Sequence, residues 1–285
     1  DKMKNDLIVK HNKIIEGKYN MTTTEIKIIA KLTSLIKKDD DDFKEHTFVS
    51  KNLLNELNLG SENYTALEES INKLISRRIE IEQDNKKKKL VTTFLSSCIY
   101  DNSGDESKII LRYDPNLKPY FIQLGSHFTK YYLENVLELN SFYAIRIYEL
   151  SKQYEKIKER IIQIKDLKEI LEIEDKYKKY NDFKKKVLEI AEREINEKTD
   201  INISFEEIKT SRKVTSIKFN IVKKEFEKSE IKEAETTEKT YSEEVERLYE
   251  KIKEIERIES LKDVIEESIE AYGIERVESN IKYSN

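Results

Sequence analysis

The stretch Arg160–Val222 decides the fold, and it reads RIIQIKDLKEILEIEDKYKKYNDFKKKVLEIAEREINEKTDINISFEEIKTSRKVTSIKFNIV. Its apolar residues alternate at the start, recur every three or four positions in the middle, and alternate again at the end. This pattern predicts a short strand, two helices and then two strands around a basic loop. The order is that of a winged helix, in which the second helix enters a groove of DNA and the loop contacts the neighbouring phosphates.

The second helix of this unit, predicted over Asn181–Glu197, has one apolar face and one charged face. Helical spacing places on a buried stripe Phe183, Val187, Ile190, Ala191 and Ile195. The opposite face carries Lys178, Asp182, Lys185, Lys186, Glu189 and Arg193. Lysines near the N-terminal end of a helix attract phosphate together with the partial positive charge of the helix end. Asp182 or Glu189 either accepts a hydrogen bond from a cytosine amino group or screens neighbouring lysines.

The loop Lys209–Lys213 completes the basic surface of this unit, because Arg212 can bind a phosphate or reach into a minor groove. We therefore predict a DNA-reading surface that consists of Lys178, Lys179, Asp182, Lys184, Lys185, Lys186, Arg193, Lys209, Ser211, Arg212 and Lys213. The plain alternative is an ordinary solvated helix face, since lysine is mostly exposed in folded proteins.

A rougher copy of the same pattern runs from Phe48 to Tyr100. Its predicted elements are a strand at His46–Val49, a helix at Ser50–Leu59 capped by Gly60, a helix at Glu62–Arg78, and strands at Ile79–Glu82, Leu90–Tyr100 and Lys108–Tyr113. When Val49–Ile81 is aligned with Ile164–Ile203, both segments show the same order of elements: the end of a strand, a short helix, a turn, a long helix and a strand. Two winged-helix domains in tandem are therefore expected.

Two further helices are predicted outside the repeated pattern. Met21–Glu25 supplies a threonine N-cap for a helix in the first unit. A helix at Ser141–Tyr154, with Ser141 as its N-cap and its apolar residues on one side, opens the second unit.

The first unit is less suited to phosphate than the second, because its long helix begins with Glu62, Glu68 and Glu69. Only its loop is strongly basic, at Lys86, Lys87, Lys88 and Lys89. We expect this loop to contact the DNA backbone and to add affinity with little sequence preference. The exposed strands of the unit can instead pair across the axis of a dimer.

Length and charge divide this α+β chain into four parts. Its 285 residues suffice for two domains and an extension. We assign 1–125 to the first winged helix, for dimerisation and backbone contacts, 126–140 to a connector packed on both neighbours, 141–225 to the DNA-reading winged helix, and 226–285 to an acidic C-terminal helical extension. The net charge of −4 divides into zero for 1–140, +4 for 141–225 and −8 for 226–285. The basic excess thus lies in the unit predicted to read DNA.

The sequence offers little for catalysis or for a cofactor. We interpret Cys98, the single cysteine, as a buried strand residue rather than a nucleophile, and one thiol forms no internal disulfide, which fits a reducing cytoplasm. Asp39–Asp42 lacks the glycine turn and distal glutamate of a calcium loop, and the histidines are scattered. The sequence holds neither a glycine-rich phosphate loop nor an apolar run long enough to span a bilayer. We expect a cytoplasmic, non-enzymatic protein without metal, cofactor or membrane contact.

Several pieces of the sequence, in the same order and spacing, resemble a known family. They are Leu139–Leu150, Tyr180–Leu188, Glu194–Asn196 before Thr199–Ile201, Arg212–Val214 and Ile217–Phe219, with Thr24–Lys27 and Arg77–Ile79 upstream. Between Leu7 and Lys224 the chain resembles the initiator replication proteins of iteron-containing plasmids, the RepA/RepB type with two winged-helix domains.

The resemblance implies binding to directly repeated origin DNA as a monomer, local opening of the duplex, and recruitment of the host initiator and the replicative helicase, without enzymatic activity. It also implies a homodimer, joined through the first domain and in equilibrium with the monomer, that represses the protein's own gene. The family's base contacts fall on Lys178–Arg193 and Lys209–Lys213 here. The tail from Glu227 lies outside the resemblance.

Two other classes of protein stay open. A winged-helix transcription regulator without an initiator role would be an obligate dimer on palindromic operators rather than on direct repeats. A helical scaffold protein would show no salt-sensitive binding to duplex DNA.

Overall fold

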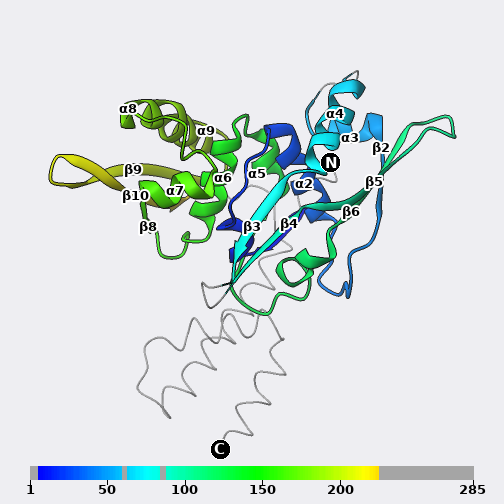
Figure 1. Cartoon of the computed structure of the whole chain (residues 1–285), viewed down its shortest axis with the longest axis horizontal. Coiled ribbons are helices and arrows are strands. Elements are labelled where there is room, and N and C mark those ends of the chain that lie inside the picture. Colours follow the sequence, from blue (N-terminus) through cyan, green and yellow to red (C-terminus); the bar gives the residue numbers. More distant parts are fainter. Residues whose placement is uncertain (1–5, 60–62, 84–87, 225–285) are drawn as a thin grey trace, which may run out of the picture. The chain divides into compact units, whose positions relative to one another are not determined.

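The computed structural model describes residues 6–59, 63–83 and 88–224 (Figure 1). Its helices and strands confirm the expected α+β class. The tail 226–285, the cap predicted at Gly60, the helix start predicted at Glu62, and Lys86 and Lys87 of the basic loop lie outside the described residues. The predicted domain boundaries at 125 and 140 stay predictions.

The C-terminal half of the described residues forms one winged helix (Figure 1). Its elements are α6 (Phe142–Lys152), β8 (Glu159–Gln163), α7 (Ile164–Ile170), α8 (Tyr180–Phe183), the π-helical segment η3 (Lys184–Leu188), α9 (Glu189–Lys198), β9 (Ile201–Thr210) and β10 (Lys213–Lys223). The strands pair antiparallel in the order β8-β10-β9. Alternation along β10 buries Ile217, Phe219 and Ile221 on the side that α7 covers.

The long helix predicted over Asn181–Glu197 is present as α8, η3 and α9 in succession, with one change of phase. In η3 the backbone N–H of Glu189 donates to the carbonyl oxygen of Lys184, five residues back. This wider turn shifts the following residues relative to the 3.6-residue spacing. As a result Leu188 is fully buried, whereas Ile190, which the spacing placed in the core, is only half-buried. The other predicted core positions, Phe183, Val187, Ala191 and Ile195, are buried as expected.

Helix α6 is buried on more than the one side that Tyr143, Ile147 and Leu150 were predicted to share. Every residue of α6 except Tyr143 is buried. The reason is that α6 contacts residues of both halves of the described chain. Arg146 donates to the carbonyl oxygen of Ile15 at 2.9 Å, and the Tyr148 hydroxyl donates to Asp200 at 2.8 Å, just before β9.

The N-terminal half carries a second unit of the same general kind. Its central elements are α2 (Thr23–Ser34), β2 (His46–Val49), α3 (Ser50–Glu56), α4 (Tyr64–Leu74), β3 (Arg78–Glu82), β4 (Lys89–Thr93), β5 (Leu95–Asp101) and β6 (Lys108–Tyr113). On α4 and β3 the helical and strand spacing is followed by Leu67, Ile71, Leu74, Ile79 and Ile81, which are buried, whereas Ile75, also predicted to be buried, is half-buried. Helix α4 ends at Leu74, not at the predicted Arg78, which already belongs to β3.

The two units repeat one detail of backbone geometry. Helix α3 ends with Asn58 at φ 56°, and helix α7 ends with Glu172 at φ 50°. In each case the next N–H bonds back across the helix end, from Leu59 to Leu54 at 3.0 Å and from Ile173 to the carbonyl of Lys168 at 2.9 Å. This left-handed helix end falls at matching places and supports the predicted repeat. It also ends α3 three residues before the predicted Leu59.

The sheets of the two units differ, and one strand prediction was wrong. The stretch predicted as a single strand, Leu90–Tyr100, is two strands separated by a bend at Phe94, whose side chain is buried. Strand β4 pairs only with β3, whereas β5 joins the sheet β2-β6-β5. The bend is fixed because the Phe94 carbonyl accepts a hydrogen bond from Asp114 at 3.0 Å.

The predicted connector 126–140 is part of the folded body. It contains β7 (Phe128–Tyr132) and α5 (Leu133–Glu138), and β7 pairs antiparallel with β1 (Leu7–His11). The short helix α1 (Asn12–Ile15) follows β1, and η2 (Pro115–Tyr120) follows β6. Among the helices of the described residues, none combines the length and apolar character needed to cross a bilayer.

Helix α2 begins with the predicted threonine cap, at Thr22. The Thr22 hydroxyl accepts from the N–H of Glu25 at 3.2 Å, and the Glu25 carboxylate accepts from the N–H of Thr22 at 2.9 Å. We predict that Thr22→Ala lowers the free energy of unfolding by about 1 kcal/mol, because a helix N-terminal donor loses its partner. Urea unfolding measures the change, with Thr24→Ala inside the helix as the matched control. Equal losses in both variants would contradict the role of the cap.

Candidate nucleic-acid interface

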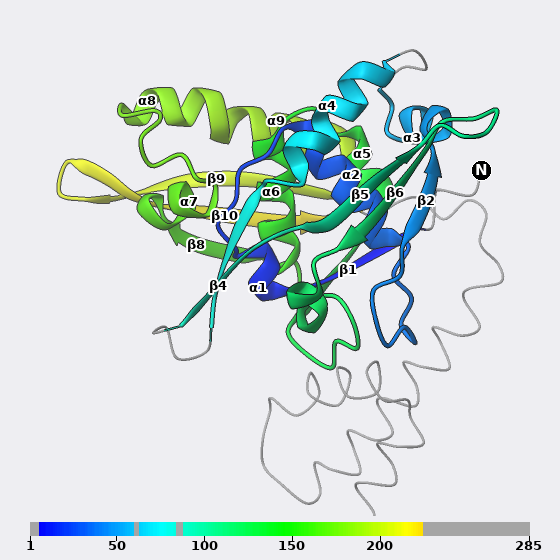
Figure 2. The same cartoon turned by 45° about the vertical axis from the view of Figure 1, so that its right-hand side comes forward.

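The charged face of the long helix is exposed as predicted. Lys185 and Lys186 of η3 and Arg193 of α9 are exposed, as are Lys178 and Lys179 just before α8. Lys179 is the N-cap residue of α8, so the partial positive charge of the helix start lies beside these lysines. Figure 2 shows this helix and α4 of the N-terminal unit along the same side of the molecule. Of the two acidic residues predicted either to contact a cytosine or to screen the lysines, Glu189 is exposed and Asp182 is half-buried.

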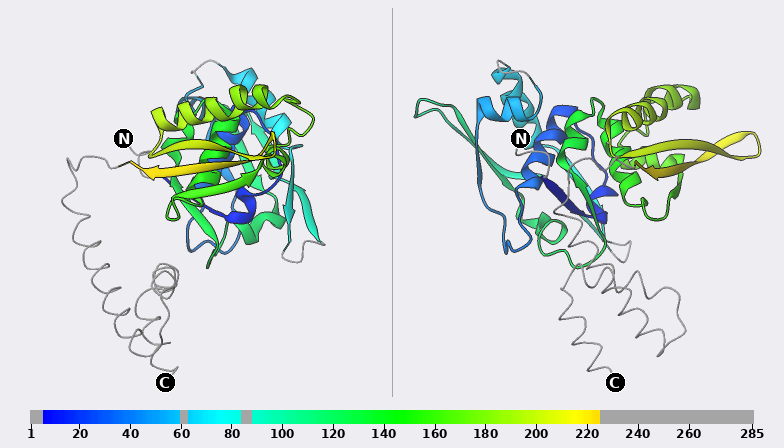
Figure 3. Two further views of the ribbon diagram at one scale, coloured as in Figure 1. Left: turned by 90° about the vertical axis from the view of Figure 1, so that its left-hand side faces the viewer. Right: turned by 180° about the vertical axis from the view of Figure 1, so that it is seen from behind.

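The predicted loop Lys209–Lys213 is a tighter hairpin than expected. Strand β9 extends to Thr210 and β10 begins at Lys213, so the turn consists of Ser211 and Arg212 alone. Ser211 has φ 58°, in the left-handed region that such tight hairpin turns use. Lys209, Ser211, Arg212 and Lys213 are all exposed. Figure 3 shows the hairpin projecting from the end of the winged helix at which α8 lies, so both cationic elements face one region of solvent.

Lys184 has a different environment from the other lysines of this face. Its ammonium group donates to Glu207 of β9 at 2.9 Å and lies 5.8 Å from the ring centroid of Phe205. The same Glu207 oxygen accepts from the Tyr180 hydroxyl at 3.0 Å. The hydrogen bond with Glu207 raises the pKa of Lys184, so this side chain stays protonated.

Sequence reasoning missed three residues that shape this surface: Lys168, Tyr180 and Glu207. Lys168 of α7 donates to the carbonyl oxygens of Lys176 at 3.3 Å and Tyr177 at 2.9 Å, and it thereby holds the turn before α8. No sequence pattern predicts a hydrogen bond from a lysine side chain to these backbone carbonyls. The role of Glu207 could have been suspected from the sequence. It lies at a position of β9 where the alternation of buried residues predicts an apolar side chain.

The basic loop of the N-terminal unit is only partly described. Lys88 and Lys89 are exposed, and Lys89 starts β4 and pairs with Glu80 at 2.7 Å. On α4, Glu68 and Glu69 are exposed, as the sequence indicated. That this unit favours backbone contacts over base contacts stays a prediction.

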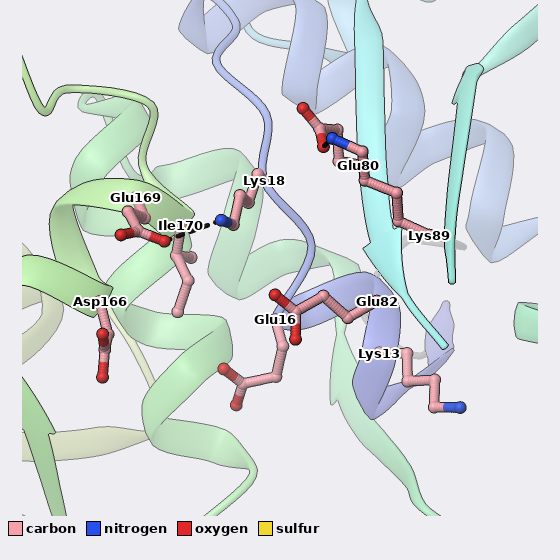
Figure 4. Close-up of a pocket in the computed structure, with 9 residues that line it drawn as sticks. All are labelled: Lys13, Glu16, Lys18, Glu80, Glu82, Lys89, Asp166, Glu169 and Ile170. Atoms are coloured by element: carbon pink, nitrogen blue, oxygen red, sulfur yellow. Dashed lines mark hydrogen bonds and ion pairs between the residues drawn. The ribbon is translucent and has the colours of Figure 1, made fainter. Parts of the chain in front are cut away.

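A cavity of about 520 Å³ lies between the two units (Figure 4). It is lined by Lys13, Glu16, Lys18, Glu80, Glu82, Lys89, Asp166, Glu169 and Ile170. Lys18 crosses from the N-terminal unit to Glu169 of α7 at 2.7 Å, and Glu16 accepts two hydrogen bonds from Arg160 of β8, at 2.8 and 3.0 Å. These pairs join the two units, and the carboxylates make the cavity unfavourable for phosphate.

The features that a catalytic reading would need are weak in the described residues. Cys98 is half-buried on β5, and burial raises the pKa of its thiol, which disfavours the nucleophilic thiolate. Among residues 6–59, 63–83 and 88–224, His, Cys, Asp and Glu form no cluster of three suited to a metal ion.

Two winged helices, one with an exposed cationic helix and hairpin tip, define a tandem winged-helix protein of the DNA-binding type. The chain belongs to the initiator replication protein family. The family's first winged-helix domain (Initiator Replication protein, WH1) matches residues 7–152, and its second (Initiator Rep protein, WH2) matches residues 163–221. This confirms the resemblance drawn from the sequence.

Similar proteins agree with this assignment. The PI protein of Escherichia coli is 33% identical over 151 residues, which cover 47% of this chain and 50% of that protein. The match thus spans about half the length of this curated relative. The crystal structure of Pi initiator protein in complex with iteron DNA aligns with a TM-score of 0.63 at 20% identity, over 78% of this chain and 99% of that chain. At this identity the alignment shows the shared fold.

Proposed function

We propose that this chain is a plasmid replication initiator that binds directly repeated DNA, the iterons of a replication origin, through its C-terminal winged helix. The observation that carries the proposal is the exposed cationic surface formed by Lys185, Lys186, Arg193 and Arg212 on a domain of the initiator family. A relative of the same fold is known in complex with iteron DNA. The winged helix supplies a helix for a major groove and a hairpin for the flanking phosphates.

The test compares two duplexes of equal length, one with the tandem repeats of the origin that the encoding replicon carries and one with the same bases scrambled. The full chain should bind the repeats at least tenfold more tightly at two salt concentrations, since specific binding exceeds non-specific binding by typically 10³-fold or more. A third duplex of equal length carries the repeat in inverted orientation, and tighter binding to it than to the direct repeats would instead favour a transcription regulator. Equal affinity for the direct repeats and the scrambled duplex would contradict sequence-specific binding.

Two residues carry the placement of this interface. We predict that Lys185→Ala and Arg212→Ala each weaken binding to the repeats about tenfold, because each removes one contact to a phosphate or base edge. Fluorescence anisotropy at fixed salt measures the change. Lys156→Ala, an exposed lysine in the turn between α6 and β8, serves as the control and should bind as the unchanged protein does. Unchanged affinity in both test variants would show that the interface lies elsewhere.

The proposal extends to the later steps of initiation. Binding as a monomer opens the duplex locally and recruits the host initiator and the replicative helicase. A homodimer, joined through the N-terminal unit and in equilibrium with the monomer, represses the chain's own gene. The protein acts without catalysis, metal or cofactor. Support for these steps comes from family membership, and permanganate footprinting of origin DNA tests duplex opening.

A further inference from the structure

Glu207 is a half-buried carboxylate at the cationic surface of the C-terminal winged helix. Glu207 stands on β9 on the same side as Ile201, Ile203 and Phe205, and it faces α8 and η3. A negative charge at this place repels phosphate, so electrostatics alone would select against it in a protein that binds DNA. Its contacts indicate what it does instead.

Glu207 joins the wing strand to the start of the basic helix. It accepts from the Tyr180 hydroxyl at 3.0 Å and from the Lys184 ammonium group at 2.9 Å, and these two donors stand four residues apart on one side of the helix. The Glu207 and Lys184 side chains are only 25% and 34% exposed. The Lys184 hydrogen bond is the main cause that holds the pKa of Glu207 below its ordinary value, so the pair is ionised at neutral pH.

We infer that Glu207 is a positioning residue. It holds the long helix (α8, η3 and α9) in a fixed position relative to the hairpin of β9 and β10, and Lys184 bonds to Glu207 rather than to a phosphate. The inference rests on the proposed function. A helix in a groove and a hairpin on the adjacent backbone must be held at a fixed separation to contact one repeat together. Tyr180 of α8, Lys184 of η3 and Glu207 of β9 supply that constraint next to Lys185 and Lys186.

Positioning and simple charge make opposite predictions for Glu207→Ala. If Glu207 only adds negative charge, its removal strengthens binding to every duplex. If it positions the helix, affinity for the repeats falls about tenfold while affinity for the scrambled duplex is unchanged or rises, because non-specific binding needs charge but not register. Both affinities are measured by fluorescence anisotropy on the full chain.

Lys184 provides the second readout. Lys184→Ala should weaken repeat binding by a similar factor without changing the slope of log affinity against log salt, whereas loss of a phosphate contact makes that slope shallower by about 0.9. Lys185→Ala is the matched control that should change the slope. The Lys184→Ala and Glu207→Ala effects should not add in the double variant, because both break the same pair. Lys184→Arg, which keeps the ion pair, should restore most of the affinity.

The outcomes separate the two proposals. If the unchanged chain does not prefer the repeats, the proposed function fails. Suppose that the unchanged chain prefers the repeats. If Glu207→Ala then strengthens binding to both duplexes, or Lys184→Ala makes the slope of log affinity against log salt shallower, only the positioning role is overturned. Circular dichroism verifies folding of each variant. If Glu207→Ala does not fold, Glu207→Gln keeps an acceptor for Tyr180 and repeats the test with the charge removed.

Discussion

Glu149→Ala should lower the free energy of unfolding by about 3–5 kcal/mol, because it leaves two buried cations without their counter-ion. Glu149 of α6 accepts from Lys10 at 2.7 Å and from Arg146 at 3.1 Å, and it also accepts from the Tyr131 hydroxyl. Glu149 and Lys10 are 1% exposed and Arg146 is fully buried. All three charges are thus shielded from water in the folded chain.

The contacts of Glu149 with Lys10 and Arg146 also predict how the loss of stability in Glu149→Ala depends on pH. Burial alone would raise the pKa of Glu149, but the adjacent Lys10 and Arg146 outweigh it and hold the pKa below its ordinary value of 4.5. A group whose pKa is lowered in the folded state stabilises the fold above its unfolded pKa. The difference between the unchanged protein and Glu149→Ala should therefore be full at neutral pH and should shrink as the pH falls below 4.5.

Urea unfolding at several pH values measures both effects. Glu197→Ala, which removes an exposed carboxylate from α9, is the matched control and should change stability by less than about 0.5 kcal/mol. Glu149→Gln should lose less than Glu149→Ala, because the amide oxygen still accepts from Tyr131. A loss below about 1 kcal/mol for Glu149→Ala would mean that water or a rearranged side chain replaces the carboxylate.

Local patterns predicted most of the C-terminal unit. The 3.6-residue spacing identified Phe183, Val187 and Ala191 as core, and strict alternation identified Ile217 and Phe219, because both periods depend on nearby residues alone. The exposed lysines of η3 followed from the same spacing. The π-helical turn at Lys184–Leu188 interrupts the 3.6-residue spacing, and no residue type in that segment predicts it.

Contacts between distant residues explain the features that local sequence did not indicate. Strand β1 pairs with β7 more than a hundred residues later, so the connector contained a strand that local sequence did not indicate. Arg146 and Glu149 are typical surface residues on any hydropathy scale, yet they are buried because each is the other's partner next to Lys10. Glu207 is similar: only the helix that it faces gives its charge a role.

Raising salt from 50 to 200 mM should weaken binding of the chain to repeat DNA by roughly 10⁴-fold. The described residues of the C-terminal interface include eight exposed cations: Lys178, Lys179, Lys185, Lys186, Arg193, Lys209, Arg212 and Lys213. If each neutralises one phosphate, log affinity falls with log salt at a slope of roughly −7, since each released counter-ion contributes about 0.9. A surface with this many cations is expected to depend on salt far more steeply than one held by base contacts.

Removing cations one at a time tests this assignment. Lys186→Ala and Lys213→Ala, from the helix and the hairpin respectively, should each make the slope shallower by about 0.9, and the double variant by about twice that. Lys156→Ala, outside the interface, should leave the slope unchanged. Titrations at four salt concentrations give each slope directly. A slope shallower than about −3 for the unchanged chain would mean that most of these side chains do not reach phosphate, and the duplex would then have to lie on another surface.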